Sequence, residues 1–210
     1  RVDRRQRQMC IRDRSITCAI PCNANGLSLW MRQPLSNHYD NQFDAPLSWN
    51  QDETDVLVMC DKVLVPWERI FVKDDAIQAR EIYFKTPAHC YGNHQSNVRY
   101  WSKMELIVGL CYKVAKATGA DEVPAVRETL GKMSALESTL SGMIYGQIEN
   151  AENWPENFKT FNRRIMYAAL NFCTDNYSMI IDELRTLCGG GVFQMPASIK
   201  AVSYTHLRAH

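Results

Sequence analysis

The chain has 210 residues, of which 46% are hydrophobic and 22% are charged. This composition excludes a disordered polypeptide and allows one large or two small domains. No apolar run approaches the roughly 20 residues of a membrane span, and no apolar segment follows the basic start as a secretory leader would require. We therefore expect a globular protein with no membrane partner.

Charge is unevenly distributed along the chain. The total is +1, with +4 in residues 1–14 and +1 in residues 201–210, which leaves −4 for the middle (1 − 4 − 1). A mildly acidic body argues against nucleic acid as a partner. The eight cysteines form no C-x-x-C pair, which favours reduced thiols in a cytoplasmic protein over a disulfide framework.

Both ends of the chain resemble translated sequencing-adapter or vector sequence. The stretches concerned are RQMCIRDRS at residues 7–15 and VSYTHLRAH at residues 202–210. We predict that residues 1–15 and 201–210 are not native, so that the chain is a fragment of a longer protein. A basic arm is the alternative interpretation of the first segment.

Residues 16–73 are predicted to form part of a β domain. Their strand-like stretches are residues 16–21, 27–32, 54–60 and 62–72, which are rich in β-branched and aromatic residues or alternate in polarity. Pro66 interrupts the last stretch and implies an edge or a turn there. Residues 34–52 are polar and turn-rich, and we expect a long surface loop.

Residues 74–92 are predicted to form a short helix, capped by Asp74 and running through Tyr83, followed by a connector containing Pro87 and Gly92. Residues 93–200 then form an antiparallel helical bundle. Its expected helices are residues 93–116, 123–150 and 163–187. The first runs apolar through Leu106, Val108 and Leu110, and the other two carry an inward apolar stripe, which on the second recurs at three and four. The fold class is therefore α+β and mainly α, with most of a four-helix bundle at the C-terminal side.

The predicted opening of the first long helix carries His94, Gln95 and Arg99. Free backbone N–H groups and the positive dipole end would suit an anion there, and Arg99 would add a fork for phosphate. A capped helix with a polar start is the alternative. No metal-ligating residue stands three or four positions after His94, so we predict no metal site.

A triple glycine, Gly189, Gly190 and Gly191, follows Cys188 at the end of the last long helix. One glycine is enough to end a helix, so three in a row indicate a backbone surface that something approaches closely. A simple helix stop is the alternative. The arginines Arg163 and Arg164 could form surface ion pairs or contact an anion or another subunit. The chain contains no self-contained catalytic motif.

Several motifs together resemble the 4-hydroxyphenylacetate 3-hydroxylase family of flavin-dependent monooxygenases. The matching stretches are LSNHYD at residues 35–40, DKVLVPWERIF at 61–71, NHQS at 93–96, NRRIMYA at 162–168 and GGGVFQMPAS at 189–198. Each motif is weak alone, but their order and spacing are specific. The resemblance covers roughly residues 16 to 200.

The resemblance implies an acyl-CoA-dehydrogenase-like fold assembled as a homotetramer. This chain would hold the end of a β-barrel-like middle domain and nearly all of the C-terminal bundle. It also implies that FAD, as FADH2 supplied by a separate reductase, reacts with O2 to give a C4a-hydroperoxide that hydroxylates a phenol ortho to its hydroxyl. The family's catalytic residues lie in the N-terminal domain, so we expect none here and an inactive fragment.

By the same resemblance, the glycines lie against FAD, and the opening of the long helix contacts its phosphate or adenine end, often across a subunit boundary. The implied cofactor-binding residues are Gln95, Arg99, Cys188, Gly189, Gly190 and Gly191. Residues 24–32 and 34–52 would form lids over the substrate, although the stretch from 43 to 50 looks longer than the family pattern.

Three competing hypotheses remain open. 4-Hydroxybutyryl-CoA dehydratase shares the implied fold, but its iron–sulfur cluster needs a cysteine seven residues after the histidine, where this chain has Trp101. A plain acyl-CoA dehydrogenase would need a carboxylate base, and Glu105, Glu137 and Glu149 are available. The third hypothesis is a non-catalytic helical oligomerisation module.

Overall fold

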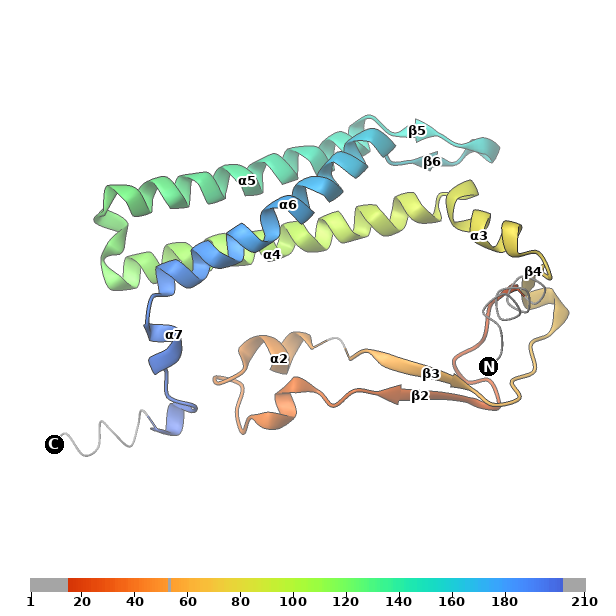
Figure 1. The fold of residues 1–210 in the computed structure, drawn as a ribbon, viewed down its shortest axis with the longest axis horizontal. Coiled ribbons are helices and arrows are strands. Elements are labelled where there is room, and N and C mark those ends of the chain that lie inside the picture. Colours follow the sequence, from red (N-terminus) through yellow and green to blue (C-terminus); the bar gives the residue numbers. More distant parts are fainter. Residues whose placement is uncertain (1–14, 53, 202–210) are drawn as a thin grey trace, which may run out of the picture. The chain divides into compact units, whose positions relative to one another are not determined.

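The computed structural model describes residues 15–201 except residue 53, so the two ends predicted to be non-native lie almost entirely outside the described residues. One compact unit contains the described residues up to Arg80 and from Met195 onward, and a second runs from Glu81 to Gln194. The helices are α2 (Pro46–Gln51), α3 (Ala76–Lys85), α4 (Ala88–Thr118), α5 (Pro124–Glu149), α6 (Arg163–Cys188) and α7 (Gly191–Gln194) (Figure 1). The strands are β1 (Ile16–Cys18), β2 (Leu27–Met31), β3 (Val56–Cys60), β4 (Ile70–Lys73), β5 (Glu152–Asn153) and β6 (Lys159–Thr160).

The first unit contains two antiparallel ribbons, β1 with β4 and β2 with β3. To within one residue, all four strands lie in stretches that the sequence predicted to be extended, but the sequence did not predict how they pair. The turn before β2 requires Gly26, whose φ is +83° and where an added Cβ would lie 2.1 Å from the carbonyl oxygen of Asp61. Only glycine, which has no Cβ, can adopt this positive φ easily and also fit so close to the carbonyl oxygen. Each sheet of the described residues has two strands, so they contain no closed barrel.

Two predictions for this unit were wrong in detail. The expected loop 34–52 contains the short helix α2, because Pro46 occupies its first turn, where the fixed φ of proline is already helical. The expected strand 62–72 begins only at Ile70. Lys62 has a φ of 55° and Trp67–Arg69 form a 3-10 turn, and neither conformation continues a β ladder.

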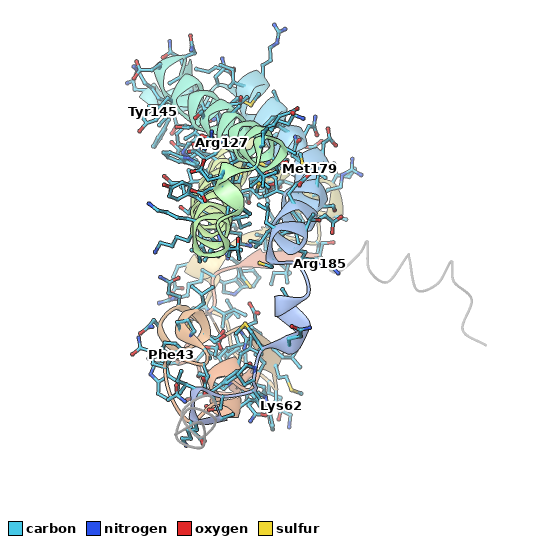
Figure 2. All side chains as sticks on the ribbon, turned by 90° about the vertical axis from the view of Figure 1, so that its left-hand side faces the viewer. Phe43, Lys62, Arg127, Tyr145, Met179 and Arg185 are labelled. Carbon is cyan, nitrogen blue, oxygen red and sulfur yellow. The ribbon has the colours of Figure 1, made fainter. Side chains whose placement is uncertain are left out.

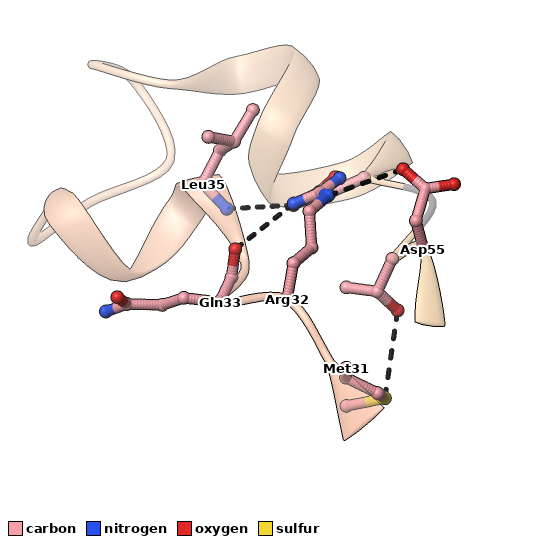
Figure 3. Close-up of polar contacts among 7 residues, drawn as sticks. Met31, Arg32, Gln33, Leu35 and Asp55 are labelled. Atoms are coloured by element: carbon pink, nitrogen blue, oxygen red, sulfur yellow. Dashed lines mark hydrogen bonds and ion pairs between the residues drawn. The ribbon is translucent and has the colours of Figure 1, made fainter. Parts of the chain in front are cut away.

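The loop between β2 and β3 is fastened at its base by Asp52. This carboxylate accepts hydrogen bonds from both terminal guanidinium nitrogens of Arg32 and from the backbone N–H of Leu35, the latter at 2.9 Å. Arg32 also donates to the carbonyl oxygen of Gln33 at 3.1 Å and pairs with Asp55 (Figure 3). A charge-assisted network of this kind holds the loop in one position.

Asp44 fastens the middle of the same loop to the C-terminal segment of this unit. It accepts hydrogen bonds from the Ser198 hydroxyl at 2.7 Å and from the Ile199 N–H at 2.8 Å, and its neighbour Asn41 donates a third at 2.7 Å. These bonds, that of Ser198 first, lower the pKa of Asp44 below its ordinary 3.8. The loop is therefore tied to a segment more than 150 positions away.

The helix boundaries around residue 90 differ from the prediction. Asp75, not Asp74, caps α3, because its side chain accepts the N–H of Gln78 at 2.9 Å. The helix α4 begins at Ala88, five residues before the predicted start, with Pro87 as its N-cap residue. Proline suits the residues that begin a helix, since their N–H groups have no intrahelical partner.

The second unit is built on α4, α5 and α6, which all pack against one another and of which α5 runs antiparallel to the other two (Figure 1). The predicted bounds of α5 and α6 are confirmed to within one residue, and Gly119, with φ of 74°, is the left-handed C-cap residue that ends α4. The buried core consists of Met104, Ile107, Cys111, Met133, Leu140, Ile144, Ala169, Cys173 and Ile180. On α5 and α6 it comes mostly from the apolar stripes that the sequence showed. On α4 the expectation was wrong, because Leu106 and Leu110 are 43% and 38% exposed and the core uses the face of Met104, Ile107 and Cys111 instead.

We predict that Ile180→Ala lowers the free energy of unfolding by about 2–5 kcal/mol, because it leaves a cavity where the side chain is fully buried. The matched control is Ile148→Ala in the same unit, where the side chain is 46% exposed. Denaturant unfolding of the two variants measures the difference. Equal losses would show that α6 does not pack as described.

We also predict that the stabilising effect of Asp44 depends on pH. Because its pKa is lower in the folded state, its contribution is present above 3.8 and is lost as the pH falls through the folded value. The gap in free energy of unfolding between wild type and Asp44→Ala should therefore narrow on acidification. Asp55→Ala is the control, because the Asp55 side chain is 93% exposed. At neutral pH we expect this variant to differ less from wild type in free energy of unfolding than Asp44→Ala does. A gap for Asp44→Ala that did not change with pH would contradict the assignment.

Candidate functional site

Gln95 and Arg99 lie on α4, but not at its opening. Since the helix starts at Ala88, their backbone N–H groups lie within the helix, and the free N–H groups belong to its first four residues. The argument that an anion binds these backbone groups was therefore wrong. Both side chains are exposed, so their direct contact with a ligand stays a prediction.

Polar side chains gather in the same part of the bundle. His94 Nδ1 lies 2.8 Å from Gln147 Oε1, and the imidazole stacks on Phe161 with ring centroids 3.6 Å apart and planes 11° apart. Asn97, one turn further along α4, is fully buried and donates to the carbonyl oxygen of Met166 at 3.1 Å. Sequence reasoning missed Gln147 and Phe161, because the contacts join positions 53 and 67 residues from His94 and no spacing rule reports them.

Two of these amides are incompletely paired. Gln147 is fully buried, yet its Nε2 has no hydrogen-bond partner among the described residues. The Oδ1 of the equally buried Asn97 also has no hydrogen-bond partner there. A buried polar group left unpaired costs about 1–3 kcal/mol. Such a cost is kept in a folded protein where a water, a ligand or a function needs the group.

The triple glycine forms the corner between α6 and α7. Gly189 has a φ of 57°, and its N–H donates to the carbonyl oxygens of Arg185 and Thr186, so it ends α6 as predicted. Gly190 and Gly191 have no such φ, and a Cβ added at either would meet no atom closer than 4.0 Å. The fold of this chain therefore requires only the first glycine.

A hollow of about 400 Å³ lies beside this corner, lined by Asp182, Arg185, Thr186, Gly189 and Val192. The Arg185 side chain is 68% exposed at the end of α6 and lies 3.4 Å from Asp182 (Figure 2). Arg185 and Thr186 were not among the predicted site residues. A cation and a hydroxyl one turn before a glycine stop are the signal that could have indicated them.

Burial is the larger cause that raises the pKa of the Cys111 thiol to about 11, and the Cys188 thiol is near enough to raise it further. The glycine corner that follows α6 lies toward the end of α4 at which that helix stops (Figure 1). Gln95 and Arg99 stand 16 and 12 positions before Cys111 (111 − 95 and 111 − 99), which is about 24 and 18 Å along the helix at its rise of 1.5 Å per residue. One chain does not bring the two predicted sets together.

Other candidates have structural partners. The indole N–H of Trp101 donates to Glu137 Oε1 at 2.5 Å, while Glu105 and Glu149 are exposed. The guanidinium of Arg163 donates a hydrogen bond to Glu152 Oε2 at 2.7 Å. This hydrogen bond, followed by the attraction between the two charges, raises the pKa of Arg163. Of the interpretations left open for Arg163, the surface ion pair is therefore observed.

Within residues 15–201, residue 53 apart, no three His, Cys, Asp or Glu side chains are grouped so that they could hold a metal ion. None of the helices in that part of the chain is long and apolar enough to cross a membrane. The seven cysteines described there are free thiols.

Two sequence models of one family match this chain. The N-terminal model of 4-hydroxyphenylacetate 3-hydroxylase matches residues 5–72, and the C-terminal model of the same enzyme matches residues 79–206. The chain belongs to the 4-hydroxyphenylacetate 3-hydroxylase family. The first match reaches into residues 1–15, and the prediction that this segment is not native stays a prediction.

The chain is also similar to curated proteins. The pyoverdin chromophore biosynthetic protein PvcC of Pseudomonas aeruginosa is 31% identical over 60% of this chain and 25% of its own length. The 4-hydroxyphenylacetate 3-monooxygenase oxygenase component of Thermus thermophilus is 27% identical over 87% of this chain and 38% of its own length. The chain thus spans well under half of these relatives.

Solved structures confirm the fold. The oxygenase component of 4-hydroxyphenylacetate 3-monooxygenase complexed with FAD superposes with a TM-score of 0.80 at 28% identity, over 88% of this chain and 39% of that one. The fold is thus acyl-CoA-dehydrogenase-like and mainly helical with small sheets. An archaeal 4-hydroxybutyryl-CoA dehydratase gives a TM-score of 0.76 at 17% identity, over 89% of this chain and 37% of that one, a likeness of fold alone.

We predict that Gly191→Ala leaves the stability of the full-length family member unchanged but weakens its binding of reduced flavin by about tenfold. The added methyl group meets no atom of this chain within 4 Å, but it would occupy the surface that a ligand approaches. Gly109→Ala, where space is equally open, is the control and should leave flavin binding unchanged. Thermal unfolding and anaerobic flavin titration measure the two effects, and unaltered binding in Gly191→Ala would remove the corner from the site.

Proposed function

We propose that this chain is part of an FADH2-dependent monooxygenase that hydroxylates a phenol ortho to its hydroxyl group. The observation that carries the proposal is the glycine corner, where two glycines that the fold does not require face open space within a chain of this family. The names of the relatives support the substrate class, because they include 4-hydroxyphenylacetate 3-monooxygenases and a 2,4,6-trichlorophenol monooxygenase. A separate flavin reductase and O2 complete the proposed reaction.

The residues present fit a flavin nucleotide. Gly189, Gly190 and Gly191 would let their backbone lie against it, and the hollow beside them holds the Arg185 cation for a phosphate. Gln95 and Arg99 would contact the phosphate or adenine end. When bound, the reduced flavin would supply the electrons with which one oxygen atom of O2 enters the phenol ring.

In this proposal, the residues of this chain bind and orient the cofactor and help to exclude water from it. The catalytic residues, and most of the residues that select the phenol, belong to the part of the protein outside this chain. The homotetramer that we predict would place Gln95 and Arg99 of one subunit and the glycine corner of another at one cofactor. The separation of about 18–24 Å along α4 between this pair and the level of the glycine corner supports such sharing. The β2–β3 and β1–β4 ribbons would belong to a β-barrel-like middle domain.

The alternatives have less support. At the position where the dehydratase cluster needs a thiolate, this chain has an indole bonded to Glu137. The same bond engages the most shielded of the three glutamates that an acyl-CoA dehydrogenase could use as its base. A non-catalytic helical module would leave Gly190 and Gly191 without a role.

The test uses the full-length protein. We expect anaerobic titration to show binding of FADH2, and admission of O2 with 4-hydroxyphenylacetate and a flavin reductase to yield the ortho-dihydroxy product, measured by chromatography. The 210-residue chain alone is the control and should give no turnover. Absence of reduced-flavin binding by the full-length protein would reject the proposal in favour of the helical module, and turnover by the chain alone would show that the reactive residues lie within it.

A further inference from the structure

The imidazole of His94 is held in one orientation by three segments of the second unit. The ring belongs to α4, its Nδ1 lies 2.8 Å from the Oε1 of Gln147 on α5, and one face stacks at 3.6 Å on Phe161, just before α6. The stacking fixes the plane of the ring and the hydrogen bond fixes its rotation within that plane. A surface histidine that only solvates its helix would need neither.

Gln147 has no packing or network role that explains its side chain. It is fully buried, its Oε1 contacts His94, and its Nε2 has no partner among the described residues. Asn97, equally buried, instead ties α4 to α6 through the carbonyl oxygen of Met166. An apolar residue of the same length at position 147 would fill the space without leaving a buried donor unpaired. The amide is therefore present for His94.

This contact determines which nitrogen of His94 carries the proton. An amide oxygen can only accept, so in the neutral ring Nδ1 must be the donor and Nε2 must present its lone pair. His94 is half-buried and neighbours the exposed Gln95. The ring thus carries one acceptor of fixed orientation in the part of α4 where cofactor contacts are predicted.

We infer that Gln147 is a positioning residue for His94, and that His94 Nε2 accepts a hydrogen bond from an N–H or O–H group of a bound ligand. This inference rests on the proposed function, which supplies two ligands with such donors, the ring N–H groups of reduced flavin and the hydroxyl of the phenol. The same nitrogen could serve either, and the experiment separates the two sources.

The experiment is a double-mutant cycle on the full-length protein. Gln147→Leu removes the acceptor at nearly constant volume, Gln147→Glu keeps an oxygen in the same place, and His94→Phe removes the ring nitrogens. Dissociation constants are measured anaerobically for FADH2, and for 4-hydroxyphenylacetate on the flavin-loaded protein. 4-Methoxyphenylacetate, which has no O–H donor, replaces the phenol in a parallel titration.

We expect Gln147→Leu to weaken one of the two ligands by about five- to tenfold, the value of one hydrogen bond, while Gln147→Glu retains most of the affinity. In the His94→Phe background, Gln147→Leu should have no further effect. Weaker FADH2 binding would identify the flavin as the donor. Weaker binding of the phenol, with the methoxy analogue unaffected, would identify the phenol.

Asn97→Leu is the matched control. Like Gln147→Leu it removes a buried amide, but this amide lies on α4 and makes no described hydrogen bond to His94. It should lower thermal stability, and its effect on ligand affinity should add to that of His94→Phe. If Gln147→Leu behaves in the same additive way, or leaves both affinities unchanged, the inference is overturned. If the wild-type protein does not bind FADH2 at all, the proposed function fails instead.

Discussion

The apolar seam between α4, α5 and α6 is the contact on which the second unit depends. Each of these helices carries a row of apolar side chains that would be exposed to water if the helix stood alone, and helices in proteins gain most of their stability from packing such rows. Burying Met104, Ile107 and Cys111 sets the rotation of α4 about its own axis. That rotation turns Gln95 and Arg99 outward. The positions of the predicted cofactor contacts therefore follow from core packing rather than from any local motif.

The seam changes character along its length. Around Cys111, Met133 and Ile180 it is apolar, whereas around Asn97 and Gln147 it contains amides that the protein pairs only in part. Buried amides are a poor way to gain stability, because each unpaired donor or acceptor loses its hydration. Their presence at one end indicates a requirement for a fixed histidine or a fixed helix register there. The apolar end of the seam thus supplies the stability of the bundle, and the end with the amides holds His94 in place.

Helices with a clear apolar period and glycine or asparagine at their ends were predictable from the sequence. α6 is an example, because the side chain of Asn162 accepts the N–H of Ile165 at its start and Gly189 follows its end. α5 is another, because Pro124 begins it and Asn150 is its C-cap residue. The start of α4 was not, since Pro87 and Gly92 read as breakers, although proline is favoured where a helix begins and the bundle tolerates a glycine inside it. Local chemistry sets such boundaries only weakly when tertiary packing supports the helix.

The candidate site was predictable only where it is local. Three consecutive glycines after a helix can be read from the sequence, and the structure adds that only Gly189 is needed for the turn. The contact of His94 with Gln147 joins two helices at a separation of 53 residues. It exists because the seam fixes the mutual register of α4 and α5, and no pattern within either helix encodes that register.

The direction of the helices decides how a cofactor of the proposed kind would be held. α4 and α6 run parallel, so the residues near the start of α4 and the glycines after α6 lie at opposite ends of one bundle (Figure 1). Closing that distance would mean breaking the buried seam, which costs far more than a few ligand contacts return. If both sets serve one flavin, either the cofactor extends along the bundle or the two sets come from different copies of the chain, as the predicted homotetramer would allow. The fold thereby links the question of cofactor binding to the question of assembly, because in the second case an isolated subunit would hold both sets of residues but could bring only one of them to a given flavin.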